Sequence, residues 1–158
     1  VREYRPDPIP AEVVGRIVEA GRLTASSMNK QPWHFVVVDD RAALQQIAAL
    51  AKTGPYIADA PLAVVVAVEK ASRFGVSDGS RAIQSMVLAA WAEGVGSNWV
   101  GFRGMDEIRA LLGLPEEYEI LAVVPFGYPV EPGGQGKKKR KPLNEVVSYG
   151  RYGGSQSE

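Results

Sequence analysis

One segment governs how the whole chain is interpreted, and it reads Ser26-Ser27-Met28-Asn29-Lys30-Gln31-Pro32-Trp33-His34-Phe35. Its first half is dense in hydroxyl, amide and amine groups, which need hydrogen-bond partners. Pro32 fixes the direction of the chain and favours an extended conformation at Gln31. The aromatic residues at 33 and 35 alternate with a histidine, which is typical of a strand with one buried face. The sequence therefore predicts a polar loop at the mouth of a core, where the polar rim of a ligand site would lie.

The segments on both sides of this loop alternate between helical and strand patterns. Apolar residues at helical spacing predict helices over residues 10–22, 40–52, 79–93 and 105–113. Shorter apolar runs predict strands over residues 35–38, 62–68 and 119–126. Because the run at 62–68 is continuously apolar, we expect it to be a central strand.

The helix expected over residues 79–93 is apolar around most of its circumference. A helix of that kind is either buried or forms half of an oligomer interface. We expect Ser77 or Asp78 to cap its first turn and Gly94 to end it. We also expect Met86 and Trp91 to lie in the core.

Composition limits the kinds of function that the chain can have. Its 158 residues suit one domain, and 18 acidic and 18 basic residues leave no net charge that would commit the domain to nucleic acid or to a membrane. The absence of cysteine excludes disulfides and thiolate chemistry. His34 is the only histidine, so we assign neither a metal site nor a catalytic side chain. No apolar run reaches membrane-spanning length and no signal peptide is visible, so we expect a cytoplasmic protein.

The polar loop resembles the FMN-binding segment of the nitroreductase family, whose pattern is roughly Pro-Ser-x-x-Asn-x-Gln-Pro-Trp-x-Phe. Ala25 stands where the family has its first proline. The resemblance implies that this loop contacts FMN through Ser26, Ser27, Asn29 and Gln31. The alternative is a helix-ending loop whose polar side chains satisfy only local backbone groups.

A second segment, Gly94-Val95-Gly96-Ser97-Asn98-Trp99-Val100-Gly101-Phe102, is similar to the family's Gly-Leu-Gly-x-x-Trp-Ile-Gly. It is not a dinucleotide fingerprint, because Trp99 stands where that pattern needs glycine and the segment follows a helix. The resemblance implies that the backbone at Val100 and Gly101 lies against the flavin ring, with an amide near its reactive N5. A side chain at Gly101 would hold the backbone away from the ring. The alternative is a short strand with a tight entry turn.

The two ends of the chain carry the remaining matches. Residues 1–4 resemble the end of the family's Arg-Arg-Ser-Val-Arg-x-Phe motif, so Arg2 inherits a contact to FMN, and the chain is expected to begin partway through that motif. Gly127-Tyr128-Pro129 resembles the turn after the family's last core strand. The basic run 137–141 precedes Pro-Leu, where the family binds FMN phosphate, so Arg140 and Lys138 are the candidate phosphate ligands.

The resemblance implies the fold and the chemistry together. The expected fold is α+β, with a nitroreductase-like mixed, largely antiparallel sheet flanked by helices in an intertwined homodimer. Residues 1–158 form one FMN-binding domain, within which 132–158 is a linker and a C-terminal arm. In the family's ping-pong mechanism NADH or NADPH reduces FMN at N5, and a nitroaromatic or quinone-like acceptor then takes the electrons. No side chain needs to act as a catalytic acid or base.

Two other functions stay open at this point. One is a flavin-bound family member with different chemistry, such as flavin breakdown or reductive dehalogenation, although the short segment 68–78 leaves little room for a substrate lid. The other is a non-enzymatic module that binds nucleic acid through the basic run Lys137–Lys141. Binding of DNA or RNA that weakens with salt, without flavin colour, would favour the second.

Overall fold

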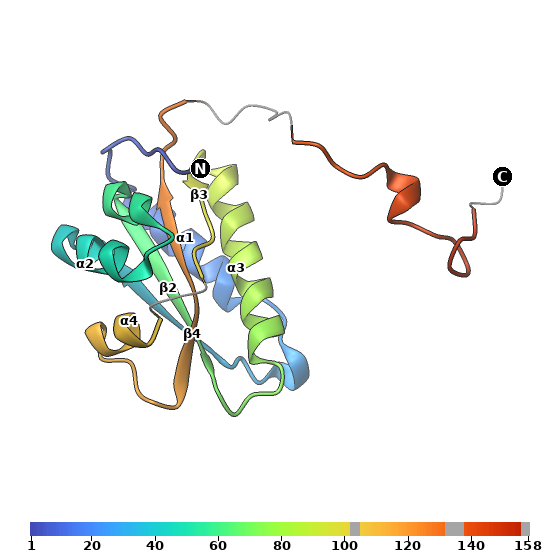
Figure 1. Ribbon diagram of the computed structural model, residues 1–158, viewed down its shortest axis with the longest axis horizontal. Helices are drawn as coiled ribbons and strands as arrows, with labels where there is room; N and C mark the ends of the chain where they lie inside the picture. Colours follow the sequence, from blue (N-terminus) through green and yellow to red (C-terminus); the bar gives the residue numbers. More distant parts are fainter. Residues whose placement is uncertain (102–104, 132–137, 156–158) are drawn as a thin grey trace.

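The protein has an α+β fold built on a four-stranded antiparallel sheet (Figure 1). The computed structural model describes residues 1–101, 105–131 and 138–155. The order of the strands across the sheet is β1 (Trp33–Val38), β2 (Leu62–Glu69), β4 (Tyr118–Gly127) and β3 (Gly96–Ser97). The α+β prediction is confirmed, and the strand pairs of the sheet are all antiparallel. Predictions for Phe102, the linker 132–136, Lys137 and residues 156–158 fall outside the described residues.

The strand β2 is the centre of the sheet, as its continuous apolar run predicts. It pairs with β1 on one side and with β4 on the other. Alternate side chains of β2 point to opposite faces, so Val65 and Ala67 belong to one core layer and Val64 and Val66 to another. A central strand of a sheet that is covered on both faces has to be apolar at every position, because neither face of the strand meets water.

Helices cover both faces of the sheet (Figure 1). The first layer of the core contains apolar residues of α2 (Arg41–Ala51), the 3₁₀ helix η2 (Pro55–Asp59) and α4 (Met105–Leu111). The second layer contains apolar residues of α1 (Ala11–Arg22) and α3 (Gly75–Ala92). The sequence offers Asp39 or Asp40 as the cap of α2, and it is the Asp40 side chain that accepts a hydrogen bond from the Ala43 N–H at 2.8 Å. Among the described residues, no helix is both long and apolar enough to cross a membrane.

The long helix α3 differs from its prediction in two ways. It begins at Gly75, with Phe74 at the N-cap position, so neither Ser77 nor Asp78 caps it. Met86 is fully buried as expected, but Trp91 is 52% exposed, so its assignment to the core is wrong. The reason is geometric: α3 packs one side on the sheet and on α1, and Trp91 lies on the other side. Gly94 follows the helix with a left-handed φ of 74° and ends it as predicted.

The chain ends differ in how they are held. The N-terminal segment lies against the sheet: Tyr4 bridges Pro129, the Arg5 N–H donates to Tyr128, and the Val1 amino group donates to the Ser97 carbonyl at 2.9 Å. Residues 138–155, called the C-terminal arm below, extend away from the body of the molecule (Figure 1). The arm contains only the short 3₁₀ helix η3 (Leu143–Glu145), and nearly all of its residues are exposed.

Candidate functional site

The loop 26–31 is held in an unusual backbone conformation. A short 3₁₀ helix, η1 (Ser27–Asn29), occupies its middle. Met28, Asn29 and Gln31 have φ values of 53°, 53° and 51°, in the left-handed region that residues other than glycine seldom adopt. The expectation that Pro32 holds Gln31 extended is therefore wrong. Backbone strain of this kind persists only where surrounding contacts impose it, and it is concentrated at functional sites.

Hydrogen bonds inside the loop account for part of this conformation. The Ser26 hydroxyl oxygen accepts from the Gln31 N–H at 2.9 Å, and the Gln31 side-chain amide donates to the Asn29 carbonyl at 3.2 Å. Because the Ser26 oxygen is the acceptor, its own proton remains available to a ligand. Local pairing therefore accounts for some of the polar groups, as the alternative interpretation expects, and leaves others facing outward.

A residue that the sequence analysis did not assign to the site lies directly behind this loop. Asp78, in the first turn of α3, is completely buried. Its two carboxylate oxygens accept hydrogen bonds from the Ser27 N–H at 3.0 Å and from the Ser27 hydroxyl at 3.3 Å. The Arg81 guanidinium pairs with the same carboxylate. The sequence did contain a signal for this role, because Asp78 is a carboxylate on the apolar side of a helix. Its position near the expected start of that helix instead favoured its interpretation as a helix cap.

The second predicted segment lies along β4. Val100 bridges Val123, donating its N–H at 2.9 Å and accepting from the Val123 N–H at 2.7 Å. A Cβ at Gly101 would lie 2.9 Å from the Leu121 carbonyl oxygen, so glycine is needed here for close packing against β4 whatever else binds. Both polar backbone groups of Val100 are therefore used, and among the described residues no acceptor is found for the Gly101 N–H.

The polar loop contacts the N-terminal part of α3 directly, and the segment carrying Gly101 is linked to it through Leu121 of β4. A Cβ at Gly79 would lie 2.8 Å from the Leu121 side chain, and the Leu121 carbonyl is the group that Gly101 approaches. Gly79 is next to Asp78, which holds Ser27. The structure thus connects the two segments through one strand and one helix.

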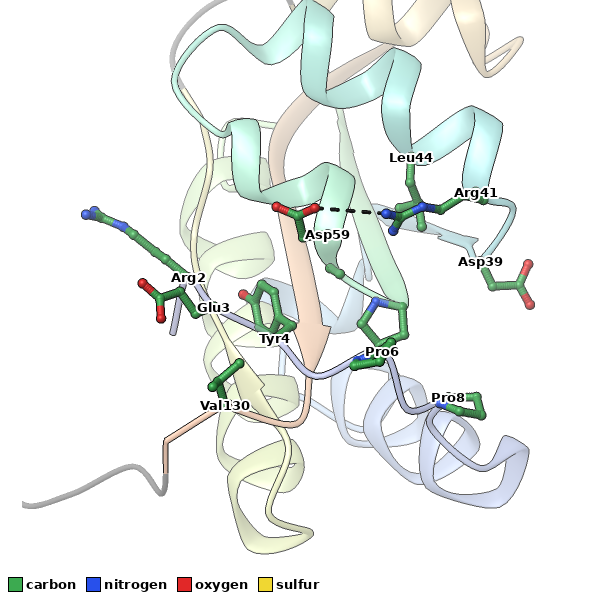
Figure 2. Close-up of a pocket in the computed structure, with 12 residues that line it drawn as sticks. Arg2, Glu3, Tyr4, Pro6, Pro8, Asp39, Arg41, Leu44, Asp59 and Val130 are labelled. Carbon is green, nitrogen blue, oxygen red and sulfur yellow. Dashed lines mark ion pairs between the residues drawn. The ribbon is translucent and has the colours of Figure 1, made fainter.

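Arg2 lies in a different part of the molecule. It lines an open pocket of about 670 Å³ together with Glu3, Tyr4, Arg41 and Asp59, among others. Its side chain extends away from Arg41 and Asp59, whose charged groups are 3.9 Å apart (Figure 2). The Arg2 guanidinium instead lies 5.6 Å from the centre of the Tyr56 ring, a distance typical of a cation–π contact. The sequence analysis gave Tyr56 no role, since nothing in its neighbourhood matches a motif.

The two basic candidates at the C-terminal end lie on the exposed arm. Burial lowers the pKa of the Val1 amino group, and the positive charges of Lys138 and then Arg2 lower it further. Lys138 therefore acts on the same end of the molecule as Arg2. Arg140 is exposed, and within the described residues no hydrogen bond or ion pair joins it to the loop 26–31.

The predicted ligands in the polar loop and near the N-terminus consequently lie at opposite ends of the sheet, whereas Val100 and Gly101 lie beside the middle of β4 and Arg140 lies on the C-terminal arm. The loop cluster (Ser26, Ser27, Asn29 and Gln31) precedes β1, whose first residue pairs with Val68 near the end of β2. The N-terminal cluster (Arg2, Lys138 and Tyr56) lies by Tyr4, which bridges Pro129 just beyond the end of β4. Because β2 and β4 are antiparallel, these are opposite ends, and one copy of the chain does not bring the two clusters together.

The described residues offer little other catalytic chemistry. Among them, no group of three or more His, Cys, Asp or Glu side chains is placed to hold a metal ion. His34 is exposed, and its ring lies 6.0 Å from that of Tyr118. Reactive chemistry at this site would therefore depend on a bound group, and the polar, pre-shaped loop is suited to holding one.

Comparison with known proteins agrees with the motifs. The profile of the Nitroreductase family matches residues 1–71 and 51–128. A protein of Methanothermobacter thermautotrophicus with the provisional name NADH dehydrogenase/NAD(P)H nitroreductase is 34% identical over 142 residues, which cover 85% of this chain and 74% of that protein.

Solved structures give the same result. A protein of Bacteroides thetaiotaomicron with the same provisional name superposes with a TM-score of 0.86 at 32% identity, over 96% of this chain and 92% of that one. An FMN-dependent nitroreductase of Clostridium difficile also gives a TM-score of 0.86, at 25% identity, over 96% of this chain and 94% of that one. The family profile extends over Arg2, the loop cluster and the sheet between them, and these matches show that the chain belongs to the nitroreductase family of oxidoreductases.

Proposed function

We propose that the protein is an FMN-dependent oxidoreductase that takes electrons from NADH or NADPH and passes them to small electron-poor aromatic acceptors, such as nitroaromatics or quinones. The observation that carries the proposal is the loop 26–31, which keeps the family's polar residues in a strained, pre-shaped backbone. Family membership supports the reaction class, and the FMN-dependent relative in Clostridium difficile supports the cofactor.

We further propose that FMN binds between two copies of the chain. Cofactor pockets bury most of their ligand, and neither cluster alone offers the groups for both the ring and the phosphate. In a two-fold symmetric dimer the loop cluster of one copy can face the N-terminal cluster of the other, and the same contact occurs twice. The separation of the clusters by the length of β2 supports this arrangement.

Two exposed apolar surfaces support a homodimer. On α3, Val76, Leu88 and Trp91 are 57%, 61% and 52% exposed. On the C-terminal arm, Leu143, Val146 and Tyr152 are 69%, 61% and 101% exposed. Large apolar side chains left exposed on one copy are available for protein–protein contacts, and an arm that buries almost nothing on its own body gains most by packing on a second copy.

The residues of the chain have separate tasks in this proposal. Ser26, Ser27, Asn29 and Gln31 hydrogen-bond the polar edge of the isoalloxazine ring, and the backbone at Val100 and Gly101 lies along the ring, with the Gly101 N–H as the available donor. Arg2, Lys138 and Arg140 supply positive charge for the phosphate and for the anionic reduced ring. FMN, when bound, supplies the two-electron chemistry of a ping-pong reaction, and no side chain transfers a proton in our account.

Reconstitution tests the proposal directly. The purified protein is incubated with FMN, desalted and examined for flavin absorbance, and its oxidation of NADH and NADPH is followed with a quinone acceptor. We expect bound flavin and a set of parallel lines in double-reciprocal plots, which is typical of a ping-pong reaction. A colourless protein after desalting would refute the cofactor assignment, and intersecting lines would refute the order of steps.

A further inference from the structure

The contact between Asp78 and Ser27 joins a helix to the loop across a long interval of sequence. Asp78 is 0% exposed, and it is the residue that stands out as polar among the buried residues of the described chain. A buried carboxylate is costly unless hydrogen bonds and an opposite charge compensate it. Here both Ser27 donors and the Arg81 guanidinium provide that compensation.

This carboxylate does not serve as the cap of its own helix. The N-cap position of α3 is Phe74, and it has no side-chain cap hydrogen bond. Among the described residues, the donors to the Asp78 carboxylate are Ser27 and Arg81. Its position in the first turn is favourable for the helix dipole, but any acidic residue there would supply that effect.

The contact is placed where it can restrain the loop backbone. Ser27 immediately precedes Met28 and Asn29, whose left-handed φ values are unfavourable for residues with side chains. Met28 is 76% exposed, so packing of its own side chain does not hold it in place. The Ser27 N–H bond to a buried group on α3 fixes the backbone at the residue where the strained turn begins.

The contact also determines whether the Ser27 hydroxyl can donate or accept a hydrogen bond toward a ligand. A carboxylate can only accept, so the Ser27 hydroxyl must donate its proton to Asp78. Its oxygen then presents only lone pairs to a ligand. Ser26 has the opposite role: its oxygen accepts from the Gln31 N–H, so its own proton stays available for a hydrogen bond to a ligand. The two neighbouring serines therefore present an acceptor and a donor side by side.

We propose that Asp78 is the positioning residue of the loop cluster: it holds the loop 26–31 in its strained conformation and orients the Ser27 hydroxyl as an acceptor toward the cofactor. This proposal rests on the proposed FMN function for its ligand, but the ordering of the loop by Asp78 does not depend on the ligand. The Arg81 guanidinium pairs with the carboxylate that accepts from both Ser27 donors and supplies the opposite charge that a buried carboxylate needs.

The test compares Asp78→Asn with a matched control, Glu19→Gln. Glu19 pairs with Arg22 on α1 at the same i,i+3 spacing that joins Asp78 to Arg81, and it is exposed and does not contact the loop. Hydrogen–deuterium exchange of peptides covering residues 24–35 is measured without FMN, and FMN affinity is measured by quenching of flavin fluorescence. The variant should exchange about tenfold faster in these peptides only, and bind FMN about tenfold more weakly. The control should match the wild type in both.

The outcomes separate positioning from a general contribution to the core. Faster exchange in the loop with unchanged exchange in β2 and the rest of α3 supports the proposal, and so does an FMN affinity that falls in Asp78→Asn but not in the control. Unchanged loop exchange with unchanged FMN affinity overturns it. Faster exchange spread evenly over β2 and α3 also overturns it, because Asp78 would then act only on the stability of the core.

Two further results keep the proposal open to refutation. If Asp78→Asn does not fold, Ser27→Ala removes the hydroxyl contact from the loop side while leaving the core residue in place, and it must still raise exchange in residues 24–35. If the wild type takes up no FMN, the proposed function fails, and the exchange measurement without FMN still decides whether Asp78 orders the loop.

Discussion

Tyr4 shows how one side chain fixes a segment that carries a predicted cofactor ligand. Tyr4 is 7% exposed, and its hydroxyl donates to the Val1 carbonyl at 2.9 Å. Burial raises the pKa of Tyr4 well above its ordinary value of 10.0, because the low-polarity surroundings disfavour the phenolate. The segment that places Arg2 thus depends on a neutral, buried phenol.

A pH dependence of stability follows from this raised pKa. In the unfolded chain Tyr4 ionises near its ordinary value of 10.0, whereas in the folded protein it keeps its proton to higher pH. The unfolded state therefore binds fewer protons above pH 10, and the stabilisation by Tyr4, complete below that pH, is lost as pH rises further. Tyr4→Phe should lower the free energy of unfolding by about 0.5–1.5 kcal/mol at neutral pH and should flatten this decline. Urea unfolding of both proteins between neutral and alkaline pH measures it, and parallel declines would contradict the assignment.

Replacing Arg140 best distinguishes two roles for the basic run, which are binding of the FMN phosphate and binding of nucleic acid. A charge-assisted hydrogen bond to phosphate contributes on the order of 1.5–3 kcal/mol, so Arg140→Ala should weaken FMN binding by about one to two decades. Turnover at saturating FMN should largely recover, because the phosphate lies far from N5. Riboflavin lacks the phosphate and should bind the wild type and the variant equally.

Arg151→Ala is the control for Arg140, since it removes the same charge from an exposed position farther along the same arm. It should leave FMN affinity unchanged. If Arg140→Ala instead leaves FMN affinity intact and weakens binding to DNA or RNA, the basic run is an interaction patch and Arg140 is not a phosphate ligand.

At the scale of single residues, the sequence identified groups by their chemical type but not by their partners. The serines and amides of the loop cluster stood out because polar groups are dense there. Gln31 was misjudged because the preference imposed by Pro32 is weaker than the hydrogen bond that its N–H makes to Ser26. Asp78 was missed because its partner, Ser27, lies far away in sequence, and periodicity carries no information on such pairs.

At the scale of secondary-structure elements, α3 shows what the periodicity of apolar residues can predict and what it cannot. The apolar spacing identified the helix and its buried side, including Met86. It did not show that the opposite side, with Leu88 and Trp91, stays uncovered on one copy of the chain, because periodicity alone does not distinguish a core from an interface. The sequence analysis placed the start of the helix too late, because it expected a polar N-cap residue and the N-cap position is occupied by Phe74.

A charge on the exposed side of α3 should prevent dimer formation. Leu88→Glu places a carboxylate in the proposed apolar interface, where burying it unpaired costs on the order of 3 kcal/mol or more. We expect a monomer with reduced FMN affinity, measured by light scattering at micromolar concentration with FMN present. Leu111→Glu on α4 is the matched control, because Leu111 is a 41% exposed leucine on the opposite face of the sheet. A dimer in both variants would exclude α3 from the interface.

For the whole molecule, the order of the family-like segments predicted the α+β fold with its largely antiparallel sheet, and the continuous apolar run at 62–68 predicted the central position of β2. The arrangement of the site could not be predicted from these segments alone, since a sequence names residues without saying which ends of a sheet they occupy. The antiparallel register of β2 and β4 places Arg2 and the loop cluster at opposite ends. That separation is the structural reason for proposing a site shared by two copies.

The shared site can be examined with two variants that are defective in different clusters. One variant carries Ser26→Ala, Asn29→Ala and Gln31→Ala in the loop cluster. The other carries Arg2→Ala in the N-terminal cluster and Arg140→Ala on the C-terminal arm, which remove proposed phosphate charges. Each should bind little FMN when purified alone. Both should fold, because the substituted side chains are not buried in the core.

Co-refolding these two variants and measuring bound FMN is the most direct test of the central claim, that FMN binds in a site built from two chains. A mixed dimer in which each chain supplies the cluster that the other lacks contains one intact site and one site defective in both clusters. We predict that the mixture regains flavin absorbance, to at most half of the wild-type amount in each mixed dimer. A mixture that stays as colourless as its two components, while wild-type protein treated in the same way binds FMN, would contradict the claim.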